Sequence, residues 1–265
     1  MPMLDVNGAR LSYLDSGAGP AVVFLHAGIA DLRMWQRQLP DLAVDHRAVA
    51  YDLRGYGESD LPPDPFAHHD DLAALLDALG IERAVLVGCS LGGMVAVDCT
   101  LAHPDRVRSL VLVGAGLSGY EWSAEFRELW RNTVGAAGED LDAAAHAEVD
   151  LWVVGPRRTR DAVDGSVLEL ATAMNRRALA REAELEENEP EPLDPPAVGR
   201  LGEVAVPTLV TTGFADVPEI HMIADRLVTG IAGAVREDVP NAAHLLPLER
   251  PDEFTRLLRD FLRSR

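Results

Sequence analysis

Short apolar runs alternate with helix-forming segments along most of the chain, and this alternation constrains the fold more than any other feature. Ala21–His26 is a continuous apolar run, as expected of a strand covered on both faces. Asp70–Leu79 instead carries leucines at helical spacing and ends before Gly80. Strands that alternate with helices form βαβ units, so we predict an α/β fold: a mostly parallel central sheet with helices on both faces. The other predicted strands are Arg10–Asp15, Arg47–Tyr51, Ala84–Gly88, Arg108–Val113, Pro207–Thr212 and Ala234–Val239, and the other predicted helices are Leu91–Ala102 and Pro251–Arg263.

The middle of the chain breaks this alternation. Helix-forming residues dominate from residue 117 to residue 198, we find no convincing strand there, and three of the four tryptophans fall in this segment. We therefore predict that residues 117–198 are an α-helical cap inserted between two strands. Residues 1–116 and 199–265 would then form one core domain. The acidic, proline-rich stretch Arg181–Pro196 is typical of a solvated helix end and loop.

Charge excludes several classes of partner. The chain has 24 basic and 43 acidic residues, a net charge of −19. Such a surface repels phosphate backbones and anionic membranes, so we expect neither nucleic acid nor a membrane as a partner. Every basic residue is arginine, which excludes a lysine Schiff base and a P-loop lysine.

We expect a cytoplasmic protein. No stretch approaches the roughly 18 apolar residues of a membrane span, and the N-terminus lacks the basic start and apolar run of a secretory signal. The two cysteines, Cys89 and Cys99, would lie about 15 Å apart along a strand end and the following helix. That distance is too long for a disulfide, which fits a reducing compartment.

The segment Gly88-Cys89-Ser90-Leu91-Gly92 carries the strongest local signal of chemistry. It follows a predicted strand and precedes a predicted helix, which is the setting of a nucleophile elbow. The turn is so sharp that Ser90 should have a strained backbone, and the positive end of the helix dipole would face developing negative charge. The alternative is an ordinary turn in which a serine caps the helix.

A nucleophilic serine needs a base and an acid that orients it. His244 lies in a loop after the last predicted strand, and Asp216 follows the strand Pro207–Thr212. Taken alone, His244 is more simply explained as a loop histidine, and Asp216 as a turn residue or helix cap. The chain order Ser, Asp, His is nevertheless that of a catalytic triad at one edge of a sheet, so we predict Ser90, Asp216 and His244 as catalytic residues.

An oxyanion hole would complete this site. The Leu91 N–H, directly after the nucleophile, should supply one donor. The second should come from the loop after Ala21–His26, with Gly28 as the first choice and Ala27 as the alternative. His26 itself we expect to be structural, holding that loop through hydrogen bonds to nearby backbone.

The chain resembles the α/β-hydrolase superfamily along essentially its whole length. Phe24-Leu25-His26-Ala27-Gly28 is similar to the His-Gly loop of the family, with Ala27 in place of the usual first glycine. That departure leaves open which amide faces the oxyanion. Asp52–Ser59 is similar to the family's D-x-R-G-x-G-x-S loop, and Gly213–Asp216 and Ala243-His244 match its acid and base positions.

The resemblance implies a serine hydrolase that works by two-step acyl transfer and needs no metal or organic cofactor. No Cys/His cluster with zinc spacing is present in the sequence. In this superfamily an aspartate nucleophile would indicate a haloalkane dehalogenase or an epoxide hydrolase, and Ser90 argues against both. Carboxylesterases, lactonases, carbon–carbon bond hydrolases, lyases and cofactor-free haloperoxidases remain, together with a receptor-like protein whose triad is idle.

The predicted cap should decide among these alternatives. Packing within the cap is the simpler explanation for each of its large aromatic residues. Because acyl pockets are mostly apolar, we expect one or two of them to contact a small-molecule substrate, a small or medium apolar ester or lactone. The sequence leaves the oligomeric state open, with a homodimer as one candidate. The candidate substrate-binding residues are Trp122, Phe126, Trp130 and Trp152.

Overall fold

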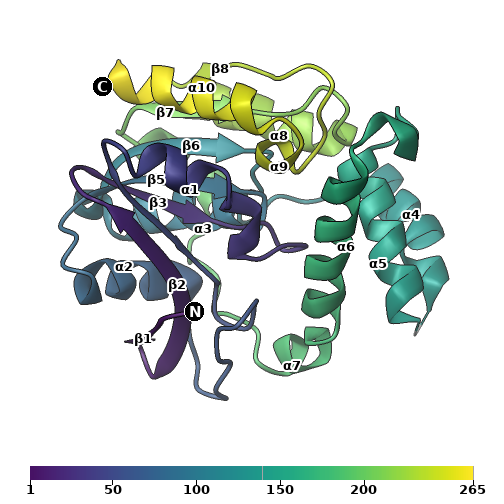
Figure 1. Ribbon diagram of the computed structural model, residues 1–265, viewed down its shortest axis with the longest axis horizontal. Coiled ribbons are helices and arrows are strands. Elements are labelled where there is room, and N and C mark those ends of the chain that lie inside the picture. Colours follow the sequence, from purple (N-terminus) through teal and green to yellow (C-terminus); the bar gives the residue numbers. More distant parts are fainter. Residues whose placement is uncertain (139, 265) are drawn as a thin grey trace.

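The computed structural model describes residues 1–138 and 140–264, and within them the chain forms one eight-stranded sheet in the order β1-β2-β4-β3-β5-β6-β7-β8 (Figure 1). The β1–β2 and β2–β4 pairs are antiparallel, and every later pair is parallel. The predicted α/β class is therefore confirmed. The strands are β1 (Met3–Val6), β2 (Ala9–Gly17), β3 (Ala21–Leu25), β4 (Arg47–Tyr51), β5 (Ala84–Cys89), β6 (Val107–Val113), β7 (Thr208–Thr211) and β8 (Val235–Arg236).

Two strands differ from the sequence prediction. β1 was not predicted, and β8 covers two residues where we expected Ala234–Val239. The ladder between β7 and β8 is interrupted because the Asp238 carboxylate accepts the Thr212 N–H at 3.0 Å, in the place of a backbone carbonyl. Pairing resumes at Val239, whose N–H donates to the Thr212 carbonyl oxygen at 2.9 Å.

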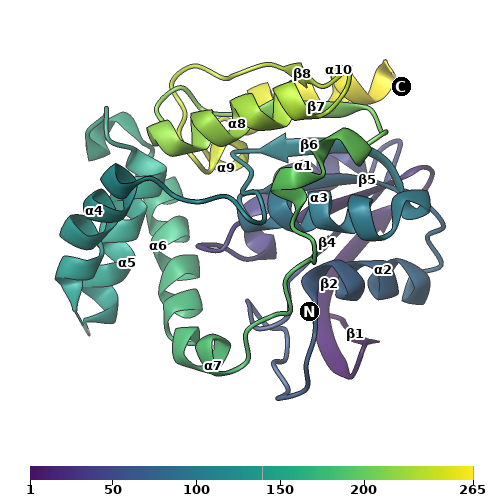
Figure 2. The ribbon, with the colours of Figure 1, turned by 180° about the vertical axis from the view of Figure 1, so that it is seen from behind.

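Helices cover both faces of the sheet (Figures 1 and 2). One face carries α2 (His68–Ala78), α3 (Leu91–Ala102) and α8 (Pro218–Gly230). The opposite face carries α1 (Gln38–Leu42), α9 (Leu246–Glu249) and α10 (Pro251–Arg263).

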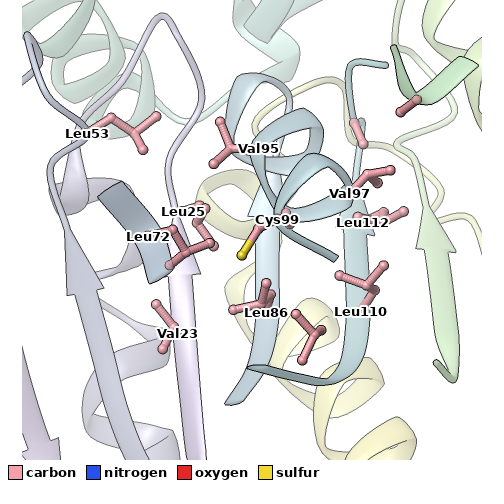
Figure 3. Close-up of a cluster of buried hydrophobic side chains, with 14 of the residues drawn as sticks. Val23, Leu25, Leu53, Leu72, Leu86, Val95, Val97, Cys99, Leu110 and Leu112 are labelled. Atoms are coloured by element: carbon pink, nitrogen blue, oxygen red, sulfur yellow. The ribbon is translucent and has the colours of Figure 1, made fainter. Parts of the chain in front are cut away.

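The central strands are apolar throughout because they are buried on both faces. Figure 3 shows β3, β5 and β6 directing alternate side chains, among them Val23, Leu86 and Leu110, toward Val95 and Cys99 of α3. The intervening residues of the same strands pack against the other helix layer. Burying one such aliphatic side chain is worth about 1.5–3 kcal/mol, so these strands form a rigid platform for the loops at their ends.

The described residues between β6 and β7 form four α-helices, with short 3-10 and π-helical turns between them: α4 (Ala124–Thr133), α5 (Leu141–Val149), α6 (Gly165–Leu179) and α7 (Glu182–Glu187). The described part of this segment contains no strand. In Figure 1 these helices lie beyond the carboxyl ends of the parallel strands, beside the core. They occupy the segment for which we predicted a cap, and the exact domain boundary stays a prediction.

The two ends of this helical segment meet above α3. The Ser118 carbonyl oxygen accepts the Val198 N–H at 3.0 Å, and its hydroxyl accepts the Ala197 N–H at 3.0 Å. The same hydroxyl donates to the buried Asp98 carboxylate at 2.6 Å. Burial raises the pKa of Asp98 to about 6, while Ser118 and Arg200 oppose the shift. The entry and exit of the segment therefore rest on one buried carboxyl group.

We expect Asp98→Asn to stabilise the protein near pH 8 and to change little near pH 4. With its pKa raised to about 6, native Asp98 binds a proton more tightly than the unfolded chain, where aspartate titrates near 3.9. The associated stability is present below about pH 4 and is lost as the pH rises through about 6. Asparagine still accepts the Ser118 hydroxyl without a charge, so urea unfolding should show a gain of about 1–3 kcal/mol near pH 8. An equal gain in stability at both pH values would contradict the raised pKa of Asp98. Asp105→Asn, at an exposed position, is the control.

Both cysteines, Cys89 and Cys99, are free and buried. Across the described residues, none of the helices has the length and apolar character that a membrane crossing requires.

Candidate active site

Ser90 lies at the tight turn between β5 and α3, with φ 52° and ψ −114°. This conformation is rare for a residue with a side chain, and it persists because its surroundings fix it. The Ser90 N–H donates to the Val113 carbonyl oxygen at 3.0 Å, and the Ser90 carbonyl accepts the Met94 and Gly116 N–H groups. The strained backbone predicted for the elbow is confirmed.

The flanking glycines are required by close packing at this turn. A Cβ atom on Gly88 would lie 2.3 Å from the Gly92 carbonyl oxygen, and one on Gly92 would lie 2.4 Å from the Leu25 carbonyl oxygen. Real Cβ contacts are essentially never that short. Helix α3 therefore approaches the ends of β5 and β3 this closely only because neither position carries a side chain.

His244 and Asp216 form a buried hydrogen-bonded pair. The His244 Nδ1 atom is 2.9 Å from the Asp216 Oδ2 atom, and the two side chains are 2% and 0% exposed. The other carboxylate oxygen of Asp216 accepts the Val217 N–H at 2.8 Å. A carboxylate at Nδ1 selects the tautomer that carries its proton there, which leaves Nε2 as the basic atom.

The serine turn and the acid–base pair lie at the same edge of the sheet. The Cys89 thiol, next to Ser90, is 3.5 Å from the His244 carbonyl oxygen. Gly114 follows the residue that accepts the Ser90 N–H, and a Cβ atom there would lie 3.1 Å from His244 Nδ1 and 3.3 Å from Asp216 Oδ2. The fold thus brings together Ser90, Asp216 and His244, which we predicted from their order in the chain, at the carboxyl ends of β5, β6 and β7.

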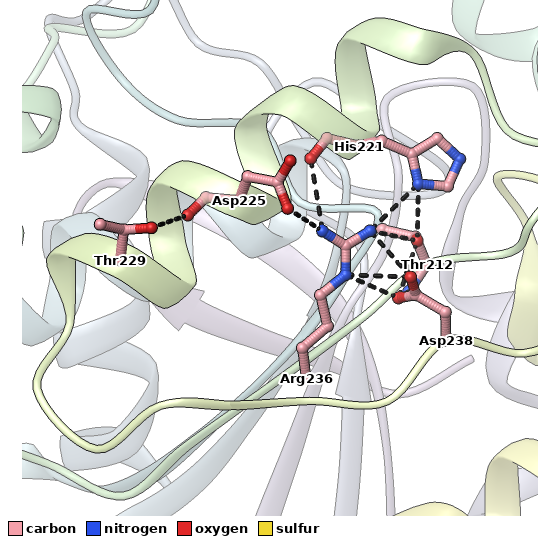
Figure 4. A network of polar contacts seen from close by, with 6 residues as sticks. All are labelled: Thr212, His221, Asp225, Thr229, Arg236 and Asp238. Carbon is pink, nitrogen blue, oxygen red and sulfur yellow. Dashed lines mark hydrogen bonds and ion pairs between the residues drawn. The ribbon is translucent and has the colours of Figure 1, made fainter.

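Asp238, a second aspartate near this edge, is engaged elsewhere (Figure 4). Its carboxylate accepts the Thr212 hydroxyl at 2.9 Å and pairs with Arg236 at 2.8 Å. Arg236 also contacts the His221 Nδ1 atom at 3.1 Å. This network joins β7, β8 and α8, and it leaves Asp216 as the acid that contacts His244.

The predicted oxyanion donors lie close to each other. Leu91 is the first residue of α3, and a Cβ atom on Gly28 would lie 3.8 Å from the Leu91 Cβ atom. Gly28, Ser90 and Leu91 are all half-buried. The Ala27 N–H instead faces the Met34 sulfur at 3.4 Å. This geometry favours Gly28 over Ala27 as the second donor.

His26 holds the loop after β3, as the sequence predicted. Its Nδ1 atom donates to the Ala27 carbonyl oxygen at 2.8 Å, and its Nε2 atom accepts the Leu53 N–H at 3.0 Å. Both ring nitrogens are used in these bonds, which gives the imidazole a structural role. The bond to Leu53 joins the loop after β3 to the loop after β4.

The four aromatic residues predicted to bind substrate line one cavity of about 1010 Å³. Trp122 and Phe126 stack with ring centroids 4.5 Å apart, and Trp130 and Trp152 complete the wall. Trp152 also packs against the His244 imidazole, with centroids 4.6 Å apart and the ring planes tilted by 36°. The same indole is therefore a wall of the cavity and a neighbour of His244.

The sequence did not indicate Glu219, which anchors the entry to the helical segment. Its buried carboxylate accepts the Tyr120 hydroxyl at 3.1 Å and the N–H and hydroxyl of Ser123 at 2.8 and 3.1 Å. Ser123 in turn caps α4, which carries Phe126. These partners lie more than 90 positions away in the chain, so no local pattern reveals them. Among the described residues, no group of three or more His, Cys, Asp or Glu is placed to hold a metal ion.

Comparisons with known proteins agree with this architecture. The family model of the alpha/beta hydrolase fold matches residues 20–147. Epoxide hydrolase 2 of Siraitia grosvenorii is 45% identical over 115 residues, which are 41% of this chain and 36% of that relative's length. The chain thus spans about a third of that relative.

Two other relatives match over the full length. The 2-hydroxy-6-oxo-6-phenylhexa-2,4-dienoate hydrolase of Comamonas testosteroni is 30% identical over 98% of this chain and 94% of its own. The solved structure of the enol-lactonase from Burkholderia xenovorans LB400 superimposes with a TM-score of 0.79 at 29% identity, covering 98% of this chain and 99% of that one. The chain belongs to the α/β-hydrolase family.

Proposed function

We propose that the protein is a serine hydrolase that cleaves a small or medium apolar ester or lactone through an acyl-enzyme on Ser90. The observation that carries the proposal is the buried bond between His244 Nδ1 and Asp216 Oδ2, beside the strained serine turn. A strained nucleophile and an oriented imidazole at one sheet edge are what acyl transfer needs.

The proposed reaction has two steps. His244 Nε2 takes the proton of the Ser90 hydroxyl as the oxygen attacks the carbonyl carbon, and the Leu91 and Gly28 amides stabilise the oxyanion. When the tetrahedral intermediate collapses, the leaving alcohol takes the proton from His244. Water then attacks the acyl-enzyme by the same route, which releases the acid and restores Ser90. Asp216 stays ionised and stabilises the imidazolium.

The aromatic cavity supports an apolar substrate. Trp122, Phe126, Trp130 and Trp152 are contiguous along one wall, and Trp152 also touches the base. The cavity reaches His244 through Trp152, whose indole lies against the imidazole with ring centroids 4.6 Å apart, while the triad residues themselves are not among its lining residues. The enol-lactonase with the same fold supports a lactone as one form of the substrate.

Carbon–carbon bond hydrolysis is the second candidate. It is favoured by the full-length match to the dienoate hydrolase of Comamonas testosteroni. The match to an epoxide hydrolase covers only 41% of this chain, and the resemblance assigns an aspartate nucleophile to that class, where this chain has Ser90.

A panel of p-nitrophenyl esters, lactones, dienoate carbon–carbon substrates and styrene oxide tests the proposal. We expect the purified protein to hydrolyse apolar esters or lactones with the largest kcat/KM in the panel. Higher turnover of the dienoates would move the assignment to the second candidate. Turnover of the epoxide alone, or no turnover together with tight binding of a small ligand, would contradict both.

A further inference from the structure

A buried ion pair joins the helical segment to the loop that carries the proposed base. The Arg158 Nη2 atom is 2.7 Å from the Glu249 Oε2 atom, and the two side chains are 12% and 3% exposed. Arg158 follows the π-helical turn Asp150–Val154, which contains Trp152, and Glu249 ends α9 just after the His244 loop. Neither side chain belongs to the triad or lines the aromatic cavity.

Arg158 binds three backbone carbonyl oxygens in addition to Glu249. It donates to Val153 at 2.7 Å and to Val154 at 2.8 Å, which satisfies the end of the π-helical turn. It also donates to Asn241 at 2.9 Å, in the His244 loop. A planar guanidinium with five donors can make these bonds together, whereas a lysine ammonium acts as a point charge.

Glu249 holds the same loop from its other side. Its Oε1 atom accepts the Ala243 N–H at 2.7 Å, directly before His244. Burial raises the pKa of Glu249, against the opposing effects of the Ala243 N–H and Arg158. Asn241, bound by Arg158, has φ 57°, in the left-handed region that asparagine enters more readily than most residues with a side chain.

We propose that Arg158 and Glu249 are positioning residues that hold the His244 loop against the Trp152 turn and so keep the imidazole oriented for proton transfer. The two held segments touch directly: the His244 N–H donates to the Trp152 carbonyl oxygen at 3.1 Å, and the two rings lie against each other with centroids 4.6 Å apart. The proposal rests on the proposed function, in which His244 is the base. A displacement of about 1 Å in a catalytic group can cost on the order of 10²-fold in rate, so the pair should act on kcat and leave KM unchanged.

Three variants test the pair: Glu249→Ala, Glu249→Gln and Arg158→Lys. We expect kcat to fall on the order of 10²-fold in Glu249→Ala and about tenfold in the other two, with KM within about twofold of wild type. Glutamine should retain more activity than alanine because its amide oxygen still accepts the Ala243 N–H. The rate at which a fluorophosphonate labels Ser90 should fall in the same order, because labelling also needs the base.

A control removes a comparable ion pair elsewhere. Asp71→Asn breaks the buried pair between Arg54 and Asp71, whose side chains are 0% and 3% exposed. Asp71→Asn and the Glu249 variants each leave an arginine without its carboxylate, so they should destabilise the protein by similar amounts. Only the Glu249 and Arg158 variants should show a lower kcat. The comparison therefore separates general destabilisation from displacement of the His244 imidazole.

Hydrogen exchange of the Ala243 and His244 amides gives a readout that does not depend on activity. Both should exchange faster in the Glu249 variants and not in Asp71→Asn. Unchanged exchange, a kcat equal to that of Asp71→Asn, or a loss confined to KM would overturn the positioning role. Faster exchange in the Glu249 variants, found together with a wild-type protein that neither reacts with the fluorophosphonate nor turns over any substrate, would instead contradict the proposed function and leave the holding of the His244 loop by Arg158 and Glu249 intact. If Glu249→Ala does not fold, the comparison of Arg158→Lys with wild type decides.

Discussion

Ser90→Ala should lower kcat/KM for an ester or lactone substrate by about 10⁴-fold or more. Alanine removes the attacking oxygen and leaves the elbow otherwise intact. The backbone bonds that hold this turn come from main-chain atoms of Val113, Met94 and Gly116, so the fold should be unaffected. Residual turnover would come from the Leu91 and Gly28 amides and from substrate binding.

The matched control is Ser16→Ala, an exposed serine on β2. Steady-state kinetics on the two variants, with thermal unfolding to show that both are folded, measure the effect. Equal activity in Ser90→Ala and wild type would remove Ser90 from the mechanism. Loss in both variants would mean that the assay reports folding and not chemistry.

The second large effect is expected for Asp216→Asn. An asparagine amide cannot hold His244 in the tautomer with its proton on Nδ1, and it brings no charge to stabilise the imidazolium. We expect kcat to fall by about 10⁴-fold near neutral pH, with KM little changed. The two side chains are 2% and 0% exposed, so bulk water cannot take the place of the lost carboxylate.

Asp238→Asn is the matched control for this substitution. Its carboxylate lies near the same sheet edge but binds Thr212 and Arg236, so the variant should lose stability and keep most of its activity. A kcat loss in Asp238→Asn as large as that in Asp216→Asn would contradict the assignment of the acid.

Much of this architecture was visible in the sequence because its signals are local. Leu91–Ala102 and Pro251–Arg263 were predicted to the residue, since helical spacing and terminal signals lie within a few positions of each other. The strained Ser90 followed from a five-residue pattern between a strand and a helix. The bond between Asp216 and His244 could be anticipated only from chain order, because 28 residues separate them.

Features that depend on distant partners were not visible. β8 was predicted too long because Asp238 competes for a backbone donor of the neighbouring strand. No local sequence pattern distinguishes Glu219 or Glu249 from other acidic residues, although the side chain of each is buried and binds groups contributed by the helical segment. Their roles arise from packing between parts of the chain that no sequence window contains together.

The proposed mechanism is tested most directly by trapping its intermediate. The protein is mixed with p-nitrophenyl acetate, quenched in acid during turnover and digested, and the peptide that contains Ser90 is examined by mass spectrometry. We predict the added mass of one acetyl group on Ser90 in wild type, more persistent in Asp216→Asn and absent in Ser90→Ala. Turnover without any acyl group on Ser90, or an acyl group carried by another residue, would contradict the nucleophilic role of Ser90.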